Sequence, residues 1–218
     1  MKKLSKVLSL VLAIALFSIC LVPYAGAASS QMIATVQVAN FLKNKELAIN
    51  SLNEVAQMSA INVEEFSLYN GTEVRVETRQ IQMPNNLVIK NTRTITTRGI
   101  NDHRVEDSYG LFWGGVAGAA GTLKVYYDYV YSDILSPNYM KTRITQAGGY
   151  GEGLDDDEYK IDGVVPQWDS AASYWAEGSV EFIMQASSGF PPFVAWNSVT
   201  YKHTCQFDNY GVPHMSWF

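Results

Sequence analysis

The residue types most suited to chemistry lie near the C-terminus. His203 and Cys205 stand two positions apart, and Asp208 and His214 follow, so the segment contains the ligand types of a zinc site. Strand alternation argues against that site, because it places His203 and Cys205 in an apolar row and Asp208 on the opposite face. The row consists of Val199, Tyr201, His203, Cys205 and Phe207. We therefore expect a core-facing strand here and no metal.

A glycine-flanked acidic loop at residues 152–162 is the second candidate for chemistry. Calcium prefers several carboxylate oxygens within a short span, and the stretch from Asp155 to Glu158 is entirely acidic. Counted from Asp155, however, Tyr159 and Lys160 occupy the fifth and sixth positions, where an EF-hand needs a ligand and a glycine. We expect a solvated loop and no cofactor, with Ca²⁺ at the Asp155 to Glu158 stretch as the alternative.

Motifs of hydrolases and phosphate-binding proteins are absent from the sequence. It contains no G-x-S-x-G, no H-E-x-x-H and no G-x-x-x-x-G-K. A two-carboxylate glycosidase stays open, because Asp169 and Glu177 stand among aromatic residues and a sequence does not give the distance between carboxyl groups. We favour a protein that is not an enzyme.

Aromatic residues favour binding over catalysis. Tryptophan and tyrosine can form flat platforms for sugar rings or anchors at a lipid interface, and they can equally fill the core of a large sheet. The sequence leaves these alternatives open. The residues of the candidate ligand platform are Trp168, Tyr174, Trp175 and Trp196.

The stretch from residue 109 to residue 123 has no charged residue, and glycines recur in it every four positions. A helix of fifteen residues spans about 22 Å, which is shorter than the hydrocarbon core of about 30 Å, whereas strands of this length can cross it. Because each glycine costs a helix interior about 1 kcal/mol, we expect strand and tight turn. The segment is either a buried strand pair or a membrane- or partner-facing element. The residues of that candidate element are Gly110, Phe112, Trp113, Gly114 and Gly118.

Residues 1–27 have the pattern of a secretory signal peptide: Lys2, Lys3 and Lys6, an apolar run, and then Ala25-Gly26-Ala27. We expect a secreted, extracellular protein. Removing this segment takes away three lysines and leaves 13 basic and 21 acidic residues, a formal charge of −8. This acidity argues against nucleic acid as a partner. Only Cys205 remains, so no disulfide can form within the chain, and we expect its thiol to be buried.

The remaining chain divides at about residue 60. Residues 28–60 predict one or two helices, with Ser51 and Glu54 as a capping box if a second helix begins there. They form either a removable pro-segment or a helix packed on the sheet, and we favour the packed helix. Residues 61–218 alternate with a period of two and predict an antiparallel β domain.

Residues 72–98 predict a long hairpin around a turn at residues 84–86. Its first strand alternates charged residues with Val74, Val76 and Thr78, the pattern of a half-buried strand, and Thr92, Thr94 and Thr96 make its return strand a candidate amphipathic element. Further strands are expected at residues 104–108, 121–131, 139–146 and 178–186 and up to about residue 208, with residues 148–153 as a loop and the C-terminal residues as a tail.

The sequence thus predicts a mainly β protein, an antiparallel β-sandwich-like domain preceded by a short helical N-terminal segment. In kind, a secreted chain with a glycine-spaced apolar segment and no enzyme motif resembles the larger antibacterial proteins and β-pore toxins that bacteria release. That resemblance implies a non-enzymatic protein that acts at the envelope or membrane of a target cell, with self-association as a further expectation. The alternative is a carbohydrate-binding or glycoside-cleaving module that uses surface polysaccharide.

Overall fold

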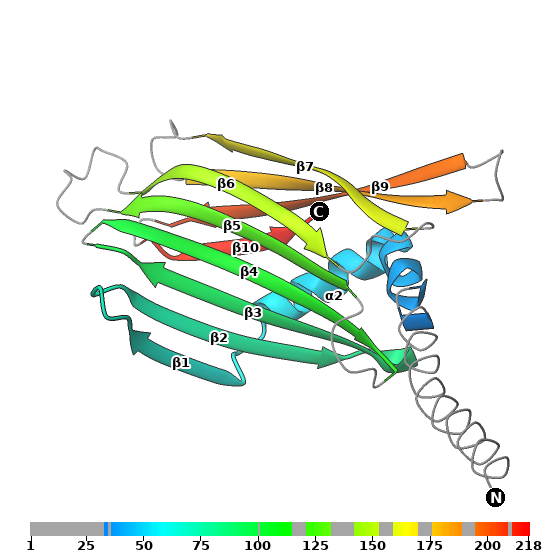
Figure 1. Ribbon diagram of the computed structural model, residues 1–218, viewed down its shortest axis with the longest axis horizontal. Helices are drawn as coiled ribbons and strands as arrows, with labels where there is room; N and C mark the ends of the chain where they lie inside the picture. The colour runs from blue at the N-terminus through cyan, green and yellow to red at the C-terminus, as the bar shows by residue number, and fades with distance from the viewer. Residues whose placement is uncertain are drawn as a thin grey trace, which may run out of the picture.

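The computed structural model describes residues 33–34, 36–99, 101–114, 121–131, 142–152, 159–169, 176–188, 195–208 and 211–218. Over these residues the chain is mainly β. A helical segment comes first in the chain, and two antiparallel sheets follow it, as the sequence predicts (Figure 1). The sheets face each other as a sandwich, and α2 (Lys45–Gln57) lies on the same side of the larger sheet as the smaller one.

The larger sheet is a meander of six strands in sequence order. Its strands are β1 (Asn62–Ser67), β2 (Glu73–Gln82), β3 (Leu87–Thr97), β4 (Asp102–Trp113), β5 (Gly121–Tyr131) and β6 (Thr142–Glu152). The smaller sheet has the order β10-β9-β8-β7. Its strands are β7 (Tyr159–Asp169), β8 (Ala176–Ser188), β9 (Ala195–Phe207) and β10 (Pro213–Trp217).

The predicted hairpin is confirmed as β2 and β3. The 3-10 turn η1 (Pro84–Asn86) joins the two strands, and Asn86 has a φ of +60°. In this register Thr78 stands opposite Thr92, and Thr92 in turn stands opposite Ser108 of β4. Side chains of these three residues therefore lie in one row on one face of the sheet.

The glycine stretch begins as a strand, as predicted. Strand β4 is longer than the expected 104–108, because it continues through Gly110 to Trp113 in register with β3 and β5. Gly114 then turns the chain with a φ of +66°, a conformation that favours glycine. Residues 115–120, and Gly118 with them, lie outside the described residues.

Two expectations for the second half of the domain are wrong. Residues 148–152 continue β6 instead of forming a loop, and their glycines make room for neighbours: a Cβ on Gly148 would lie 2.5 Å from the Tyr126 hydroxyl, and one on Gly149 would lie 2.6 Å from the Lys124 carbonyl oxygen. The expected C-terminal tail is strand β10, which pairs with β9. Glycine-rich composition therefore does not by itself indicate a loop.

The helical segment packs on the sheet, as favoured from the sequence. Residues 36–43 are helical, and α2 then starts at its N-cap Asn44, whose side chain accepts a hydrogen bond from the Leu47 N–H. The predicted capping box at Ser51 is wrong, because Ser51 lies inside α2 and donates its hydroxyl to the Leu47 carbonyl at 2.8 Å. The buried face of α2 contacts β2, β3, β9 and β10.

The core lies between the two sheets and under the helical segment. Its largest fully buried side chains include Tyr109, Tyr127, Phe182 and Trp217. The prediction for the last long strand is confirmed, since His203 and Cys205 are completely buried on the apolar face of β9.

Candidate functional site: the two faces of β2 and β3

The hairpin of β2 and β3 presents two chemically different faces. We call the face toward α2 and the smaller sheet the covered face, and the opposite one the open face. All open-face residues of the hairpin are half-buried or exposed, and Lys90 is the one charged residue among them. The open face comprises Val74, Val76, Thr78, Gln80 and Gln82 of β2 and Val88, Lys90, Thr92, Thr94 and Thr96 of β3.

The polarity of β2 is reversed relative to an ordinary half-buried strand. Alternation was predicted correctly, but it is the charged residues that lie on the covered face, while the valines lie on the open one. Along that covered row, exposure falls from Arg75, which is exposed, to Arg79, which is buried at 7%. Nothing in the alternation itself indicates which face is covered, so sequence reasoning missed this arrangement.

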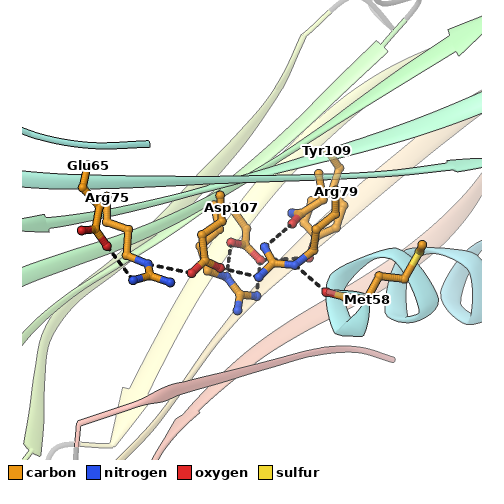
Figure 2. Close-up of polar contacts among 9 residues, drawn as sticks. Met58, Glu65, Arg75, Arg79, Asp107 and Tyr109 are labelled. Carbon is orange, nitrogen blue, oxygen red and sulfur yellow. Dashed lines mark hydrogen bonds and ion pairs between the residues drawn. The ribbon is translucent and has the colours of Figure 1, made fainter. Parts of the chain in front are cut away.

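Ion pairs run along the covered face from the sheet edge to Arg79, and a hydrogen bond from Arg79 continues to the end of the helix (Figure 2). Arg75 contacts Glu65 of β1 at 2.7 Å and Glu77 of its own strand at 2.8 Å. Glu77 also accepts a hydrogen bond from Arg79. Burial alone would raise the pKa of Glu77, but the hydrogen bonds from Arg79 and Arg75 outweigh it and hold this pKa below its usual value.

Arg79 ties the hairpin to the helical segment. Its Nε donates to the Met58 carbonyl, just beyond the end of α2, at 2.8 Å, and its Nη1 donates to the Asn91 side chain at 3.4 Å. The row of charges therefore ends at the Met58 carbonyl oxygen, which receives no hydrogen bond from within α2 because the helix ends there. This contact links β2 to the position of α2.

A second, largely buried ion pair holds the hairpin to β4. Arg93 donates two parallel hydrogen bonds to Asp107, each 2.8 Å long, and the Tyr109 hydroxyl donates to the same carboxylate at 3.1 Å. Burial would raise the pKa of Asp107, but the charge of Arg93 prevails and lowers it. Asp107 thus stays ionised inside the sandwich, and Arg93 remains its counter-ion.

His203 lies beside this pair, on the opposite sheet. The Tyr127 hydroxyl donates to the His203 carbonyl at 3.1 Å, so the imidazole Nδ1, 3.0 Å from the same hydroxyl, is the donor in that contact. Trp217 packs edge-on to the imidazole, with ring centroids 4.7 Å apart. Burial lowers the pKa of His203 to about 4, so the ring is neutral at pH 7.

These groups are arranged for structure more than for catalysis. Glu65, Glu77 and Asp107 each have an arginine partner, and His203 has no route to solvent because it is completely buried. Within the described ranges, no cluster of three or more His, Cys, Asp or Glu residues could hold a metal ion. The side chains that remain accessible at this site are those of the open face, whose one charge is Lys90.

The glycine-stretch residues separate between the two faces. Gly110 and Phe112 lie on the open face of β4, half-buried, opposite Lys90 and Val88 of β3. Trp113 points to the covered side, where it packs against the core and borders a pocket of about 400 Å³ between the helical segment and the hairpin turn. Gly114 is exposed in the turn. The structure therefore brings Gly110 and Phe112 together and separates Trp113 from them.

The remaining candidate residues fall where the structure gives no side chain. Trp168 and Trp196 belong to β7 and β9 by their backbone, and their side chains lie outside what is described. Tyr174, Trp175 and the acidic stretch from Asp155 to Glu158 lie outside the described residues altogether. The platform and the calcium alternative both stay predictions.

Comparison with known proteins returned no protein family, no curated protein and no solved structure that matches this chain. In the described part of the chain, no helix combines the length and the apolar character needed to cross a membrane. The site must therefore be interpreted from its own geometry.

Proposed function

We propose that the protein is released from the cell, is not an enzyme, and acts on the lipid of another cell's envelope through the β2–β3 hairpin. The observation that carries this proposal is the reversed polarity of the hairpin. Valine, threonine and glutamine lie on its open face with Lys90 as the one charge, whereas Arg75, Glu77 and Arg79 lie on the covered face and pair with one another. A water-soluble sheet ordinarily does the opposite.

Strand length supports the proposal. Strands β2 and β3 have 10 and 11 residues, and about nine to eleven suffice to cross the hydrocarbon core. Valine and threonine on one face could meet lipid, while Arg75, Glu77 and Arg79 carry their own partners on the other. If the hairpin left the sheet, the contacts of Arg93 with Asp107 and of Arg79 with Met58 would break. These contacts hold the hairpin in the sheet until binding to a membrane offsets their loss.

A pair of engineered disulfides tests whether the hairpin must leave β4. Thr92 stands opposite Ser108 of β4 on one side and Thr78 of β2 on the other, all on the open face. Directly opposed residues have Cα atoms about 4.5–5.5 Å apart, within the range of about 4.4–6.8 Å that disulfides span. The T92C/S108C variant locks the hairpin to β4, whereas T78C/T92C locks only the two strands of the hairpin to each other.

The readout is dye release from phosphatidylcholine vesicles by the chain from residue 28. We expect the oxidised T92C/S108C variant to release no dye and to recover release on reduction, while T78C/T92C releases dye in both states. Cys205 does not interfere, because its thiol is buried. Equal release by both oxidised variants, or no release by the unmodified chain at micromolar concentration, would exclude this mechanism.

One observation favours a second function, binding of a surface polysaccharide. Tyr150 of β6 lies on the open face of the larger sheet and is 41% exposed. Its hydroxyl accepts a hydrogen bond from Lys124 at 2.7 Å. An exposed ring beside polar groups suits a sugar. A cation lies over both this ring and that of its neighbour Tyr126: Lys124 Nζ is 5.0 Å from the centre of the Tyr150 ring, and the Arg104 guanidinium is 4.4 Å from the centre of the Tyr126 ring. Retention on insoluble polysaccharide, lost in Tyr150→Ser, would support this alternative.

A further inference from the structure

The turn between β1 and β2 exposes large apolar side chains. Phe66 is 46% exposed, Leu68 is 47% exposed and Tyr69 is fully exposed. We call these three residues the β1–β2 tip. They are neighbours in sequence at the end of a hairpin, so they form one apolar projection at the margin of the larger sheet.

Turn geometry does not explain these residues. The turn is closed by hydrogen bonds from the Leu68 N–H to the Thr72 carbonyl and from the Gly71 N–H to the Leu68 carbonyl, at 2.8 and 2.9 Å. Asn70 accepts a hydrogen bond from the Thr72 N–H, and Gly71 adopts a φ of +81°. These contacts require Asn70 and Gly71, which are usual turn residues, and they use only the backbone of Leu68. Leu68 and Tyr69 could be polar without loss to the fold.

A second copy of the chain does not suit this surface. Strand β1 is the exposed edge of the sheet, and its central residues are Glu64 and Glu65, both exposed. In either central register of β1 paired antiparallel with itself, faces matched, Glu64 or Glu65 stands opposite its own copy, and like charges in opposed positions are destabilising. Charged residues on an edge strand are a usual protection against edge-to-edge pairing.

Continuity with the open face indicates a different occupant. Phe66 stands opposite Val74 of β2, and Val74 stands opposite Thr96 of β3, so the tip extends the uncharged row of the hairpin to the edge of the sheet. The tip is flanked by the exposed carboxylates of Glu64 and Glu73, while Glu65 is paired with Arg75. This surface would be repelled by anionic headgroups and suits a zwitterionic bilayer.

We propose that the β1–β2 tip is a membrane anchor, which inserts Phe66, Leu68 and Tyr69 into the interface of a zwitterionic bilayer before the hairpin acts. The inference rests on the proposed function for the identity of its partner. Tyrosine is favoured at the level of the headgroups, and burial of apolar side chains drives such binding. Binding through this tip needs no anionic lipid and resists salt.

Vesicle flotation tests the anchor separately from dye release. The test variant is L68S/Y69S, and the matched control is V212S/F218S, which removes two apolar side chains that are 47% and 57% exposed elsewhere on the surface. We expect L68S/Y69S to lower partitioning onto phosphatidylcholine vesicles by at least about tenfold, because the apolar contact area is lost. The control variant should bind like the unmodified chain, at low and at high salt.

Several outcomes would overturn the anchor and leave the proposed function standing. One is dye release with unchanged flotation of L68S/Y69S. Another is binding that requires phosphatidylglycerol and disappears in salt. A third is a dimer in solution that L68S/Y69S dissociates, since a second copy would then be the occupant. Conversely, flotation that depends on the tip, without any release of dye, would support the anchor and contradict the proposed function.

Discussion

At the scale of single residues, His203 makes the protein sensitive to acid. Its imidazole is neutral and enclosed between Tyr127 and Trp217, across the core from Asp107 and Arg93. Protonation would place a second cation beside Arg93 without water to solvate it. The Asp107 carboxylate would attract this cation, but burial is the larger effect, and so the pKa falls to about 4.

This arrangement predicts a loss of stability in mild acid. Because the pKa of His203 is lower in the folded protein than the usual value of about 6.5, stability is full above pH 6.5 and decreases as pH falls toward 4, by up to about 3 kcal/mol. The lowered pKa of Asp107 acts in the same direction at lower pH. Urea unfolding at pH 7, 5.5 and 4.5 measures the effect. His203→Gln should flatten the slope between pH 6.5 and 4.5, and an unchanged slope would show that other groups cause it.

At the scale of elements, strand β6 illustrates why a glycine-rich sequence can form a strand. Its glycines let neighbouring groups cross it closely. Above Gly148 lies the end of the Tyr126 side chain, which can move, whereas beside Gly149 lies the carbonyl oxygen of Lys124, which is held in the sheet. The two positions therefore tolerate a methyl group differently.

Alanine substitution distinguishes the two glycines. We expect Gly149→Ala to destabilise the protein by about 2 kcal/mol or more, because backbone must shift. Gly148→Ala should cost less than about 1 kcal/mol, because the Tyr126 side chain can swing away. Thermal unfolding of both variants gives the comparison. Equal costs would mean that residues 148–149 are not held in the β6 register.

The sequence predicts the elements of this fold better than their surroundings. Alternation identified the hairpin of β2 and β3 and the apolar row of β9, because a period of two is a local property. The uncharged, glycine-spaced composition placed Gly110, Phe112 and Trp113 in one candidate surface, although alternation along β4 sends Trp113 to the covered side. Alternation also could not reveal that Arg79 caps the C-terminal end of α2 or that Arg93 pairs with Asp107, since these contacts join residues on different elements.

At the scale of the whole molecule, the helical segment belongs to the core. Leu42, Leu52 and Val55 are each at most 1% exposed. The Asn53 side chain donates a hydrogen bond to the Trp217 carbonyl at 2.9 Å and accepts one from the Trp217 N–H at 2.7 Å. This segment therefore bridges the edge strand β10 and the hairpin. Whether residues 1–27 are removed as a signal peptide, and whether residues 28–60 are removed as a pro-segment, are still predictions.

Deletion of residues 1–60 tests the role of this segment. We expect the chain from residue 61 to lose cooperative unfolding, because the apolar side chains under α2 and the Arg79 guanidinium would lose their partners. The matched control is the chain from residue 28, which keeps α2. Near-ultraviolet circular dichroism during thermal unfolding compares them. A cooperative transition in the shorter chain would show that residues 28–60 are dispensable and would restore the pro-segment interpretation.

The proposed function requires that the open face of the hairpin meets lipid while the covered face does not. A polarity-sensitive fluorophore on Thr94→Cys reports the open face of β3, and the same fluorophore on Glu73→Cys reports the exposed end of the opposite, charged row of β2. Cys205 stays unlabelled because burial raises its thiol pKa well above the usual value. On addition of phosphatidylcholine vesicles, we predict that the emission from position 94 shifts to the blue and that the emission from position 73 does not shift. Emission that stays water-like at both positions, or shifts equally at both, would contradict the account.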